Sequence, residues 1–260
     1  MNTQEYDSLA GVYDHLQQAV DPVAWADYIE SLQQKYSGLA MGDGQDGRPI
    51  LVDLGCGTGS FCLEMEKRGY DPIGIDASTR MLEQARAKAA AAGAERCLFL
   101  QQDIARFELF GTVDLIVCLL DTLNHLLKHS EVARLLKLCA NYLNPGGLFI
   151  FDVLSSDYLS RRLGNNVFYD NDPKQTMLWQ NSFSSRNGIS RSEILLFTRT
   201  ADNCYERSEA IVRERLYRRD ELTGYIKEGG LELLAVHGDL TDTAARRYDN
   251  RHFYICRRPY

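Results

Sequence analysis

The sequence predicts an α/β fold, in which a mostly parallel sheet flanked by helices is followed by an antiparallel addition. Two observations carry this prediction. Short apolar runs alternate with helical patterns between residues 50 and 153, and period-two patterns replace the helical ones between residues 176 and 216. Parallel strands joined by right-handed crossovers place a ligand outside the carboxyl ends of the strands. We therefore expect a site where the apolar runs end.

The N-terminal residues predict helices. Apolar residues recur at helical spacing in residues 6–16, and Asp21 followed by Pro22 is typical of an N-cap and the first position of a second helix. We expect residues 1–36 to form a helical lid or buttress. A glycine-rich segment, residues 37–49, then predicts a flexible connection into the first strand.

Residues 52–60, Val-Asp-Leu-Gly-Cys-Gly-Thr-Gly-Ser, are the most informative stretch, because a short apolar strand runs into three glycines at alternate positions. Without a Cβ, Gly55, Gly57 and Gly59 let the backbone turn sharply and approach a ligand closely. A dinucleotide-binding loop would have its third glycine where Ser60 stands, and the chain has no Gly-Lys-Ser/Thr motif for a triphosphate. The loop therefore predicts a ligand site of another kind.

Further strands follow the glycine loop in order. Residues 73–76, Ile-Gly-Ile-Asp, predict a second strand ending in Asp76, a carboxylate placed to accept hydrogen bonds from ribose hydroxyls. The alternative for Asp76 is a solvated turn residue or the cap of a helix that begins near Thr79. The remaining pattern predicts strands at residues 97–100, 113–118 and 148–153, and helices at residues 79–92 and 131–143.

These landmarks together resemble the class I S-adenosylmethionine-dependent methyltransferases. The first motif of that family reads like residues 52–60, its adenine-contacting aspartate matches Asp103, and residues 144–147, Asn-Pro-Gly-Gly, match its turn before the fifth strand. The resemblance implies S-adenosyl-L-methionine as cofactor and a Rossmann-like class I methyltransferase sheet, mostly parallel with an antiparallel last strand. The cofactor-binding residues that it implies are Asp53, Gly55, Cys56, Gly57, Gly59, Asp76, Ala77, Met81, Gln102, Asp103, Ile104 and Leu119.

After Val153 the pattern changes. Alternating apolar and polar residues, separated by turn signals, predict three antiparallel strands at residues 176–184, 191–200 and 205–216. We expect a methyltransferase core of residues 37–155 and 217–260, with an antiparallel insertion of residues 156–216 that covers the substrate. The core is predicted to close with a helix at residues 220–227 and strands at residues 231–236 and 252–257.

An antiparallel extension at this place is similar to that of the small-molecule branch of the family, which includes sugar N,N-dimethyltransferases and glycine N-methyltransferase-like enzymes. Enzymes that methylate amino groups of nucleic acids and proteins often carry Asn/Asp-Pro-Pro-Tyr/Phe, where this chain has Leu119-Leu120-Asp121. The resemblance therefore implies methyl transfer by direct SN2 displacement to a small molecule, on nitrogen, oxygen or carboxylate. The alternatives are an RNA or protein methyltransferase and a non-catalytic S-adenosylmethionine-binding protein.

An amine or hydroxyl acceptor needs a base, and the sequence offers His125, Asp121, Tyr13, His15 and Tyr169. His125 and Asp121 follow the strand that the resemblance places under the reaction centre, and an unperturbed histidine titrates near ~6.5. We expect His125, Asp121 and Tyr13 to be the catalytic residues. Apolar periodicity explains Tyr13 equally well, and a carboxylate acceptor would need no base.

The composition, 45% hydrophobic and 25% charged over 260 residues, is typical of a soluble enzyme. Seven cysteines without a Cys-x-x-Cys pair predict reduced core thiols of a cytoplasmic protein and no metal site. The net charge of −7, and the small excess of basic over acidic residues within 161–260, disfavour nucleic acid as a partner. No apolar run is long enough to span a bilayer, so we expect no membrane partner, and the oligomeric state is left open.

Overall fold

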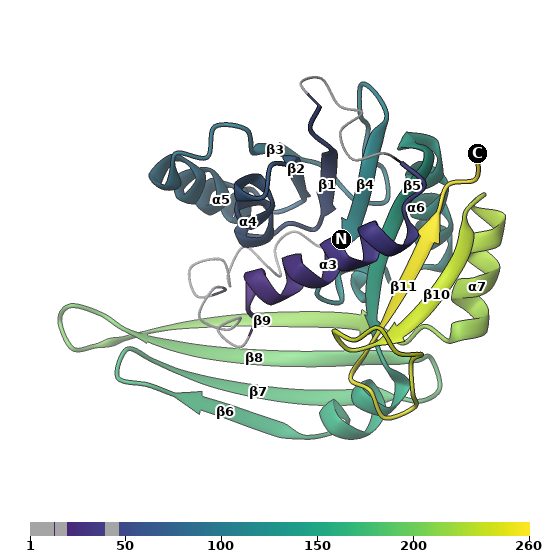
Figure 1. Cartoon of the computed structure of the whole chain (residues 1–260). Helices are drawn as coiled ribbons and strands as arrows, with labels where there is room; N and C mark the ends of the chain where they lie inside the picture. The colour runs from purple at the N-terminus through teal and green to yellow at the C-terminus, as the bar shows by residue number, and fades with distance from the viewer. Residues whose placement is uncertain (1–12, 14–19, 40–46) are drawn as a thin grey trace.

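The computed structural model describes residues 13, 20–39 and 47–260, and these residues form two sheets (Figure 1). The predicted helix at residues 6–16 lies outside the described residues except for Tyr13, whose backbone is helical, and so does most of the predicted glycine-rich connection. The larger sheet contains β1 (Ile50–Leu54), β2 (Asp71–Asp76), β3 (Leu98–Gln101), β4 (Val113–Cys118), β5 (Leu143–Leu154), β10 (Glu232–Gly238) and β11 (Arg251–Arg257).

The order of this seven-stranded sheet is β10-β11-β5-β4-β1-β2-β3. Strands β1 to β5 pair in parallel, whereas β11 runs antiparallel to both β5 and β10. Val52 on β1 is in register with Ile73 on β2 and Ile116 on β4, so the carboxyl ends of these strands meet at one edge. The predicted class I sheet, with an antiparallel last strand, is confirmed.

Helices cover both faces of the sheet (Figure 1). On one face α3 packs its Trp25, Ile29 and Leu32 against alternate residues of the central strands, and on the other face the opposite alternates pack against α6. Burial on both faces explains why these strands read as continuous apolar runs. The helices are α3 (Pro22–Tyr36), α4 (Ser60–Lys67), α5 (Thr79–Ala92), α6 (His129–Tyr142) and α7 (Arg219–Glu228).

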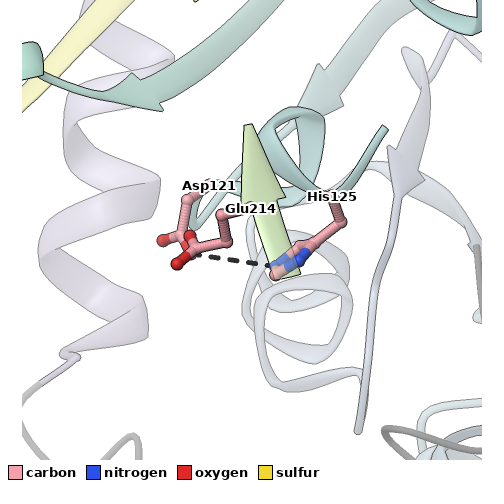
Figure 2. A group of neighbouring side chains, drawn as sticks. All are labelled: Asp121, His125 and Glu214. Carbon is pink, nitrogen blue, oxygen red and sulfur yellow. Dashed lines mark ion pairs between the residues drawn. The ribbon is translucent and has the colours of Figure 1, made fainter. Parts of the chain in front are cut away.

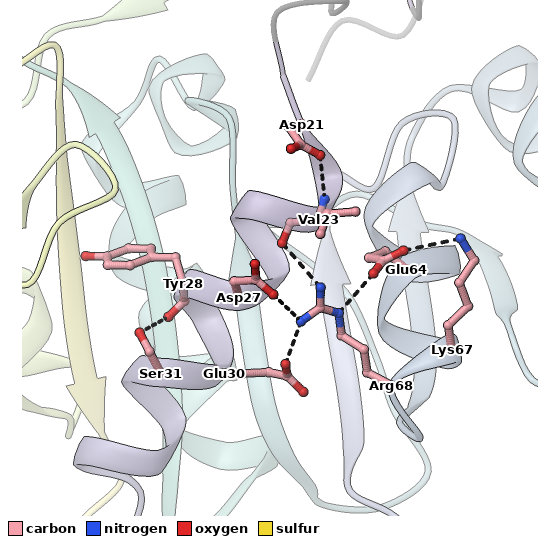
Figure 3. Close-up of polar contacts among 9 residues, drawn as sticks. All are labelled: Asp21, Val23, Asp27, Tyr28, Glu30, Ser31, Glu64, Lys67 and Arg68. Carbon is pink, nitrogen blue, oxygen red and sulfur yellow. Dashed lines mark hydrogen bonds and ion pairs between the residues drawn. The ribbon is translucent and has the colours of Figure 1, made fainter.

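Helix α3 begins as its sequence predicts, with the Asp21 carboxylate accepting a hydrogen bond from the Val23 amide at 3.0 Å. Arg68, at the end of α4, joins the two helices (Figure 3). Its guanidinium lies 2.7 Å from Asp27 and 2.6 Å from Glu30, and also contacts Glu64 of its own helix at 3.0 Å. Helix α3 is thereby fixed beside the start of α4, which immediately follows the glycine loop.

The smaller sheet has four strands, one more than predicted, in the order β6-β7-β8-β9 and all antiparallel. All five residues of β6 are exposed, so this edge strand lacks the buried alternate positions by which its neighbours were recognised. In Figure 1 the sheet lies across the end of the larger sheet where β5 finishes. Its strands are β6 (Val167–Asn171), β7 (Gln175–Ser184), β8 (Ile189–Arg199) and β9 (Tyr205–Arg215).

Two short helical segments, η1 (Thr122–His125) and the π-helix η2 (Tyr158–Leu163), follow β4 and β5. Asn124 in η1 is wholly buried and joins the two ends of the insertion. Its side-chain amide donates to the Arg215 carbonyl at 2.8 Å, and its side-chain oxygen accepts from the Leu154 amide at 3.0 Å. The exits of β5 and β9 are therefore held by one side chain.

The turn predicted at residues 144–147 is part of β5, where a register shift against β4 and a positive φ of 85° at Gly146 accommodate it.

The seven cysteines are free thiols. Five of them lie in the core, whereas Cys97 is partly exposed and Cys204 is exposed. Within the described part of the chain, no helix combines the length and the apolar character that crossing a membrane requires.

Candidate functional site

The glycine loop between β1 and α4 has the backbone that its sequence predicts. Gly55, Gly57 and Gly59 have φ values of 81°, 52° and 76°, a region that favours glycine. A Cβ on Gly55 would lie 2.4 Å from Thr122, and one on Gly59 would lie 2.9 Å from the Phe99 ring. A Cβ on Gly57 would meet only the Tyr13 ring, at 3.5 Å, so this glycine leaves room at the loop surface.

The carboxylate of Asp76, at the carboxyl end of β2, binds the backbone of the glycine loop. It accepts hydrogen bonds from the Gly57 amide at 3.0 Å and from the Ser78 amide at 2.8 Å. The Ser78 hydroxyl in turn caps α5 by accepting from the Met81 amide. Asp76 therefore organises the loop and the helix start together, and the cap of α5 proposed as an alternative role for it belongs to Ser78.

Two cavities meet at this loop, and both are lined by Tyr13, Gly55 and Leu120. The first cavity, about 310 Å³, lies between the loop and α3, with Trp25, Asp53, Cys56, Phe61 and Leu119 in its wall. The second cavity, about 270 Å³, lies between the loop and the smaller sheet. Its wall includes Gly57, Met81, Asp121, His125, Leu154, Tyr158, Met177, Trp179, Ser192, Ile194, Val212, Glu214 and Arg251.

Four residues that the sequence predicts in the cofactor site, Ala77 after β2 and Gln102, Asp103 and Ile104 after β3, have local roles. The Gln102 amide exchanges two hydrogen bonds with the backbone of Glu108, and the Asp103 carboxylate accepts from the Ala105 amide at 2.9 Å. Ile104 is buried in the core next to them, and Ala77 is half-buried beside Asp76. None of these four residues lines either cavity.

Asp53, on β1, is a buried carboxylate in the wall of the first cavity. Burial raises the pKa of Asp53 to about 7, and a hydrogen bond from the Cys62 thiol, at 3.5 Å, opposes this. The charge of Asp76 raises the same pKa further. The floor of the loop therefore contains a carboxyl group that a cation in the first cavity would help to ionise.

The chain turns sharply after β4. Leu120 and Asp121 both have left-handed backbones, with φ of 55° and 56°, which side-chain-bearing residues rarely adopt. The turn is held from β5, where the Asp152 carboxylate accepts from the Asp121 amide at 3.0 Å. Backbone strain of this kind persists only where surrounding contacts fix it, and here it places Asp121 in the wall of the second cavity.

Arg251, on β11, balances two carboxylates at this turn. One guanidinium nitrogen lies 2.6 Å from Asp121 and 2.6 Å from the wholly buried Asp152. Burial alone would lower the pKa of Arg251, but its two carboxylate neighbours raise it. Burial raises the pKa of Asp152, which Arg251 counteracts. One positive charge is thus shared by two negative ones, of which Asp152 is wholly buried and Asp121 partly buried.

Glu214, on β9, adds a third carboxylate beside Asp121 and His125 (Figure 2). One ligand atom from each of the three side chains lies within 4.8 Å of the other two. Glu214 is 5% exposed, and its Oε1 is a buried oxygen with no hydrogen-bond partner among the described residues. Burial, and then the neighbouring Asp121, raise the pKa of Glu214 well above its usual value.

The ring of His125 is oriented by β9. Its Nδ1 lies 3.2 Å from the Arg213 carbonyl, which can only accept, so Nδ1 carries the proton in the neutral ring. Nε2 then carries the lone pair, and it lies 3.9 Å from the Asp121 carboxylate. The arrangement can take up a proton at Nε2 and stabilise the resulting charge with Asp121.

Of the five bases that the sequence offers, the structure brings three to the second cavity: His125, Asp121 and Tyr13. Tyr169 is 78% exposed on β6 and lines neither cavity, and His15 lies outside the described residues. Glu214 and Arg251 were missed. The signal for Glu214 was present, because it continues the inward alternation of Ala210 and Val212 on β9.

The cluster offers donor atoms that a metal ion could use, whereas the sequence predicts no metal site. The guanidinium of Arg251, 2.6 Å from Asp121, already places a positive charge beside these donors. A divalent cation at the same place would be repelled by it. The Asp121 carboxylate of the cluster is therefore already paired with a cation of the chain itself.

Comparisons with known proteins agree with this geometry. A methyltransferase-domain family matches residues 51–147. The putative methyltransferase YqeM of Bacillus subtilis is 30% identical over 251 residues, which are 96% of this chain and 95% of that protein. The chain belongs to the S-adenosylmethionine-dependent methyltransferases. The cofactor of this methyltransferase is accordingly S-adenosyl-L-methionine.

Solved structures share the whole fold of the methyltransferase. An S-adenosylmethionine-dependent methyltransferase from Clostridium acetobutylicum is 28% identical, covers 98% of this chain and 99% of its own, and superposes with a TM-score of 0.86. An amino pentose methyltransferase from Micromonospora echinaspora, solved with S-adenosylmethionine bound, is 19% identical. The match covers 95% of this chain and 96% of the other, with a TM-score of 0.72. The shared fold therefore includes the smaller sheet.

Proposed function

We propose that the methyltransferase transfers its methyl group to a small molecule bound in the second cavity. One observation carries this proposal: the cavity joins the glycine loop, through Gly57, to inward-facing residues of the smaller sheet, such as Met177 and Glu214. Its volume of about 270 Å³ is that of a site for a small ligand rather than for a folded partner. The amino pentose methyltransferase, which has the same fold, supports a small acceptor.

An RNA acceptor fits the cavity less well. RNA binding depends on lysine and arginine side chains that neutralise phosphates, whereas the chain carries a net charge of −7. Among the described residues, Arg251 supplies the one guanidinium in the cavity wall, and it is already paired with two carboxylates. These charges favour a small acceptor that is not a polyanion.

The residues of the loop fit the cofactor. We infer that Gly55 and Gly57 let the backbone approach it closely, and that the Asp76 carboxylate accepts hydrogen bonds from its ribose hydroxyls. Leu119 and Cys56 would contact it from the first cavity and Met81 from the second. When bound, S-adenosylmethionine supplies a methyl group on a positively charged sulfur, which makes the methyl carbon electrophilic.

The chain's own contribution is then alignment and proton removal. The strained turn at Leu120 and Asp121 and the smaller sheet fix the acceptor against the loop and exclude water, and positioning of this kind lowers the barrier to transfer. His125 is the base that we propose for an acceptor with a proton to lose, because its Nε2 carries the lone pair and Asp121 stabilises the charged ring.

A screen of metabolite extracts with isotopically methyl-labelled S-adenosylmethionine tests the proposed function. The expected result is a mass increase in one small compound or a small set of them, dependent on the protein. Methylation confined to the RNA or protein fraction would contradict the proposal, as would a cofactor that binds but loses no methyl group to any fraction.

Asp76→Ala is expected to weaken cofactor binding by roughly 10- to 100-fold without unfolding the protein, because one or two charge-assisted hydrogen bonds are lost. Titration calorimetry with S-adenosylhomocysteine measures the effect. Asp71→Ala, at the opposite end of the same strand, is the matched control and should bind like the unmodified protein. Equal dissociation constants for the two folded variants would remove Asp76 from the site.

A further inference from the structure

The second cavity has more negative than positive charge at one end, whereas β7 and β8 line it with uncharged residues. Glu214 is on β9, Asp121 immediately precedes η1, His125 ends η1, and Arg251 is on β11. Asp152, on β5, lies behind Arg251 and is not part of the cavity wall. Tyr158, on η2, also faces the cluster, and burial raises its pKa so that it stays neutral. Arg251 offsets one of the three carboxylates. The remaining excess lies at Glu214 and Asp121.

Glu214 is the unusual member of this group. The side chain is almost wholly buried and lines the cavity, and its Oε1 has no partner among the described residues. A buried carboxyl oxygen of this kind costs free energy unless it receives a hydrogen bond or an opposite charge. Arg251 is held by Asp121 and Asp152, at 2.6 Å each, and Asp121 is the side chain that shares a hydrogen bond with Glu214. A donor for the remaining oxygen, Oε1, would therefore come from a ligand in the cavity.

The charge discriminates between the acceptor classes that the sequence leaves open. A carboxylate acceptor would bring a further negative charge next to Glu214 and Asp121 and would be repelled. A hydroxyl would donate one hydrogen bond but would leave the charge unbalanced. An ammonium group supplies both a positive charge and several N–H donors to one small volume.

We propose, building on the function proposed above, that the acceptor is a small amine whose nitrogen is bound between Glu214 and Asp121. The amine enters as an ammonium ion, and one of its protons moves to Nε2 of His125, which lies in the same cluster. The nitrogen lone pair then forms the bond to the methyl carbon, while the electron pair of the carbon–sulfur bond returns to sulfur. The methylated nitrogen is again cationic, so Glu214 faces a cationic nitrogen before and after the transfer, and the charge resides on His125 in between.

The rest of the cavity fits the body of such a molecule. Met177, Trp179 and Ile194 line it from the smaller sheet, and Trp179 is oriented by a hydrogen bond from its indole nitrogen to Asn181 at 2.8 Å. An apolar wall opposite a carboxylate pair suits a compact ring or chain that carries an amine at one end.

The test is a binding experiment that needs no turnover. Cyclohexylammonium and cyclohexanol are titrated by NMR into the protein saturated with S-adenosylhomocysteine, because the two probes share a shape and differ in the charged group. We expect cyclohexylammonium to bind at least about tenfold more tightly, and Glu214→Gln to abolish this preference, as one charge-assisted hydrogen bond predicts. Glu206→Gln, an exposed position on the same strand, is the control and should keep the preference.

Equal binding of the two probes, no binding of the ammonium at millimolar concentration, or a preference that survives Glu214→Gln would each overturn the amine assignment. The labelled-cofactor screen separates this failure from that of the proposed function. Label in a hydroxyl compound alone contradicts the amine and leaves small-molecule methyl transfer standing. Label in no small molecule contradicts the proposed function itself.

Folding of the variant is checked by its melting temperature, which also reports on the carboxyl group. The folded-state pKa of Glu214 is raised above its value of 4.5, so the protein loses stability as the pH rises toward that folded-state pKa. Glutamine removes this loss. We therefore expect Glu214→Gln to melt higher than the unmodified protein near pH 8, with a smaller difference near pH 5.

Discussion

Replacing Arg251 with methionine is expected to lower the free energy of unfolding by about 3 to 5 kcal/mol, the usual cost of removing one partner from a buried ion pair. The guanidinium is the positive charge that lies 2.6 Å from both Asp121 and Asp152, and Asp152 is wholly buried. Without Arg251, the buried Asp152 and the partly buried Asp121 lose the cation that compensates them. Urea denaturation near pH 8, followed by circular dichroism, measures the loss.

Arg257→Met, on the same strand, is the matched control. Its partner Glu232 is half-exposed, so this change should cost less than about 1 kcal/mol. The Arg251 variant should also lose less stability near pH 5 than near pH 8. Removing the guanidinium raises the folded-state pKa of Asp152 further, and a raised carboxyl pKa contributes stability that is lost as pH rises. Equal losses for both arginine variants would contradict the shared-charge network.

His125→Ala is expected to reduce the rate of methyl transfer by about 10² to 10⁴-fold, the usual range for removing a general base. The affinity for the cofactor should stay nearly constant, because His125 lines the acceptor side of the loop and not the first cavity. Single-turnover kinetics with the acceptor found by the labelled screen, together with calorimetry for the cofactor, separate the two quantities.

The ring of His125 also joins η1 to β9, through the Arg213 carbonyl. If that were its only role, His125→Ala would lower stability by about 1 to 3 kcal/mol and leave turnover of the folded protein intact. His252→Ala is the control, because its ring also contacts a backbone carbonyl, that of Arg246, and lines neither cavity. A destabilised but fully active His125 variant would leave positioning alone as the catalytic contribution of the chain.

The core of the fold could be predicted because its signals are local. A strand such as β4 is buried on both faces and reads as one apolar run, and the glycine loop requires left-handed backbone that only glycine adopts freely. The helix from Thr79 to Ala92 was predicted with its observed bounds. The exposed edge strand β6 lacks a buried face and therefore lacks a pattern.

The wall of the second cavity, where we propose that the acceptor binds, could be predicted only in part, because it is assembled from distant segments. Asp121 and His125 follow β4 and could be found from the order of motifs. Glu214 and Arg251 reach the same place from β9 and β11, and no local pattern shows that two strands so far apart in sequence meet the turn after β4. The inward alternation of β9 indicates that Glu214 is buried, but not what it faces.

Asn124 fastens both ends of the antiparallel insertion to the core through the Leu154 amide and the Arg215 carbonyl. The residues between Leu154 and Arg215 thus form a long loop whose two ends are held together by Asn124. The entropy of closing such a loop grows only with the logarithm of its length. A change of strand length within this loop therefore costs little chain entropy, and the contacts of Asn124 keep both ends of the insertion in place beside the turn at Asp121. Under the proposed function, the acceptor pocket could thus be rebuilt separately from the glycine loop.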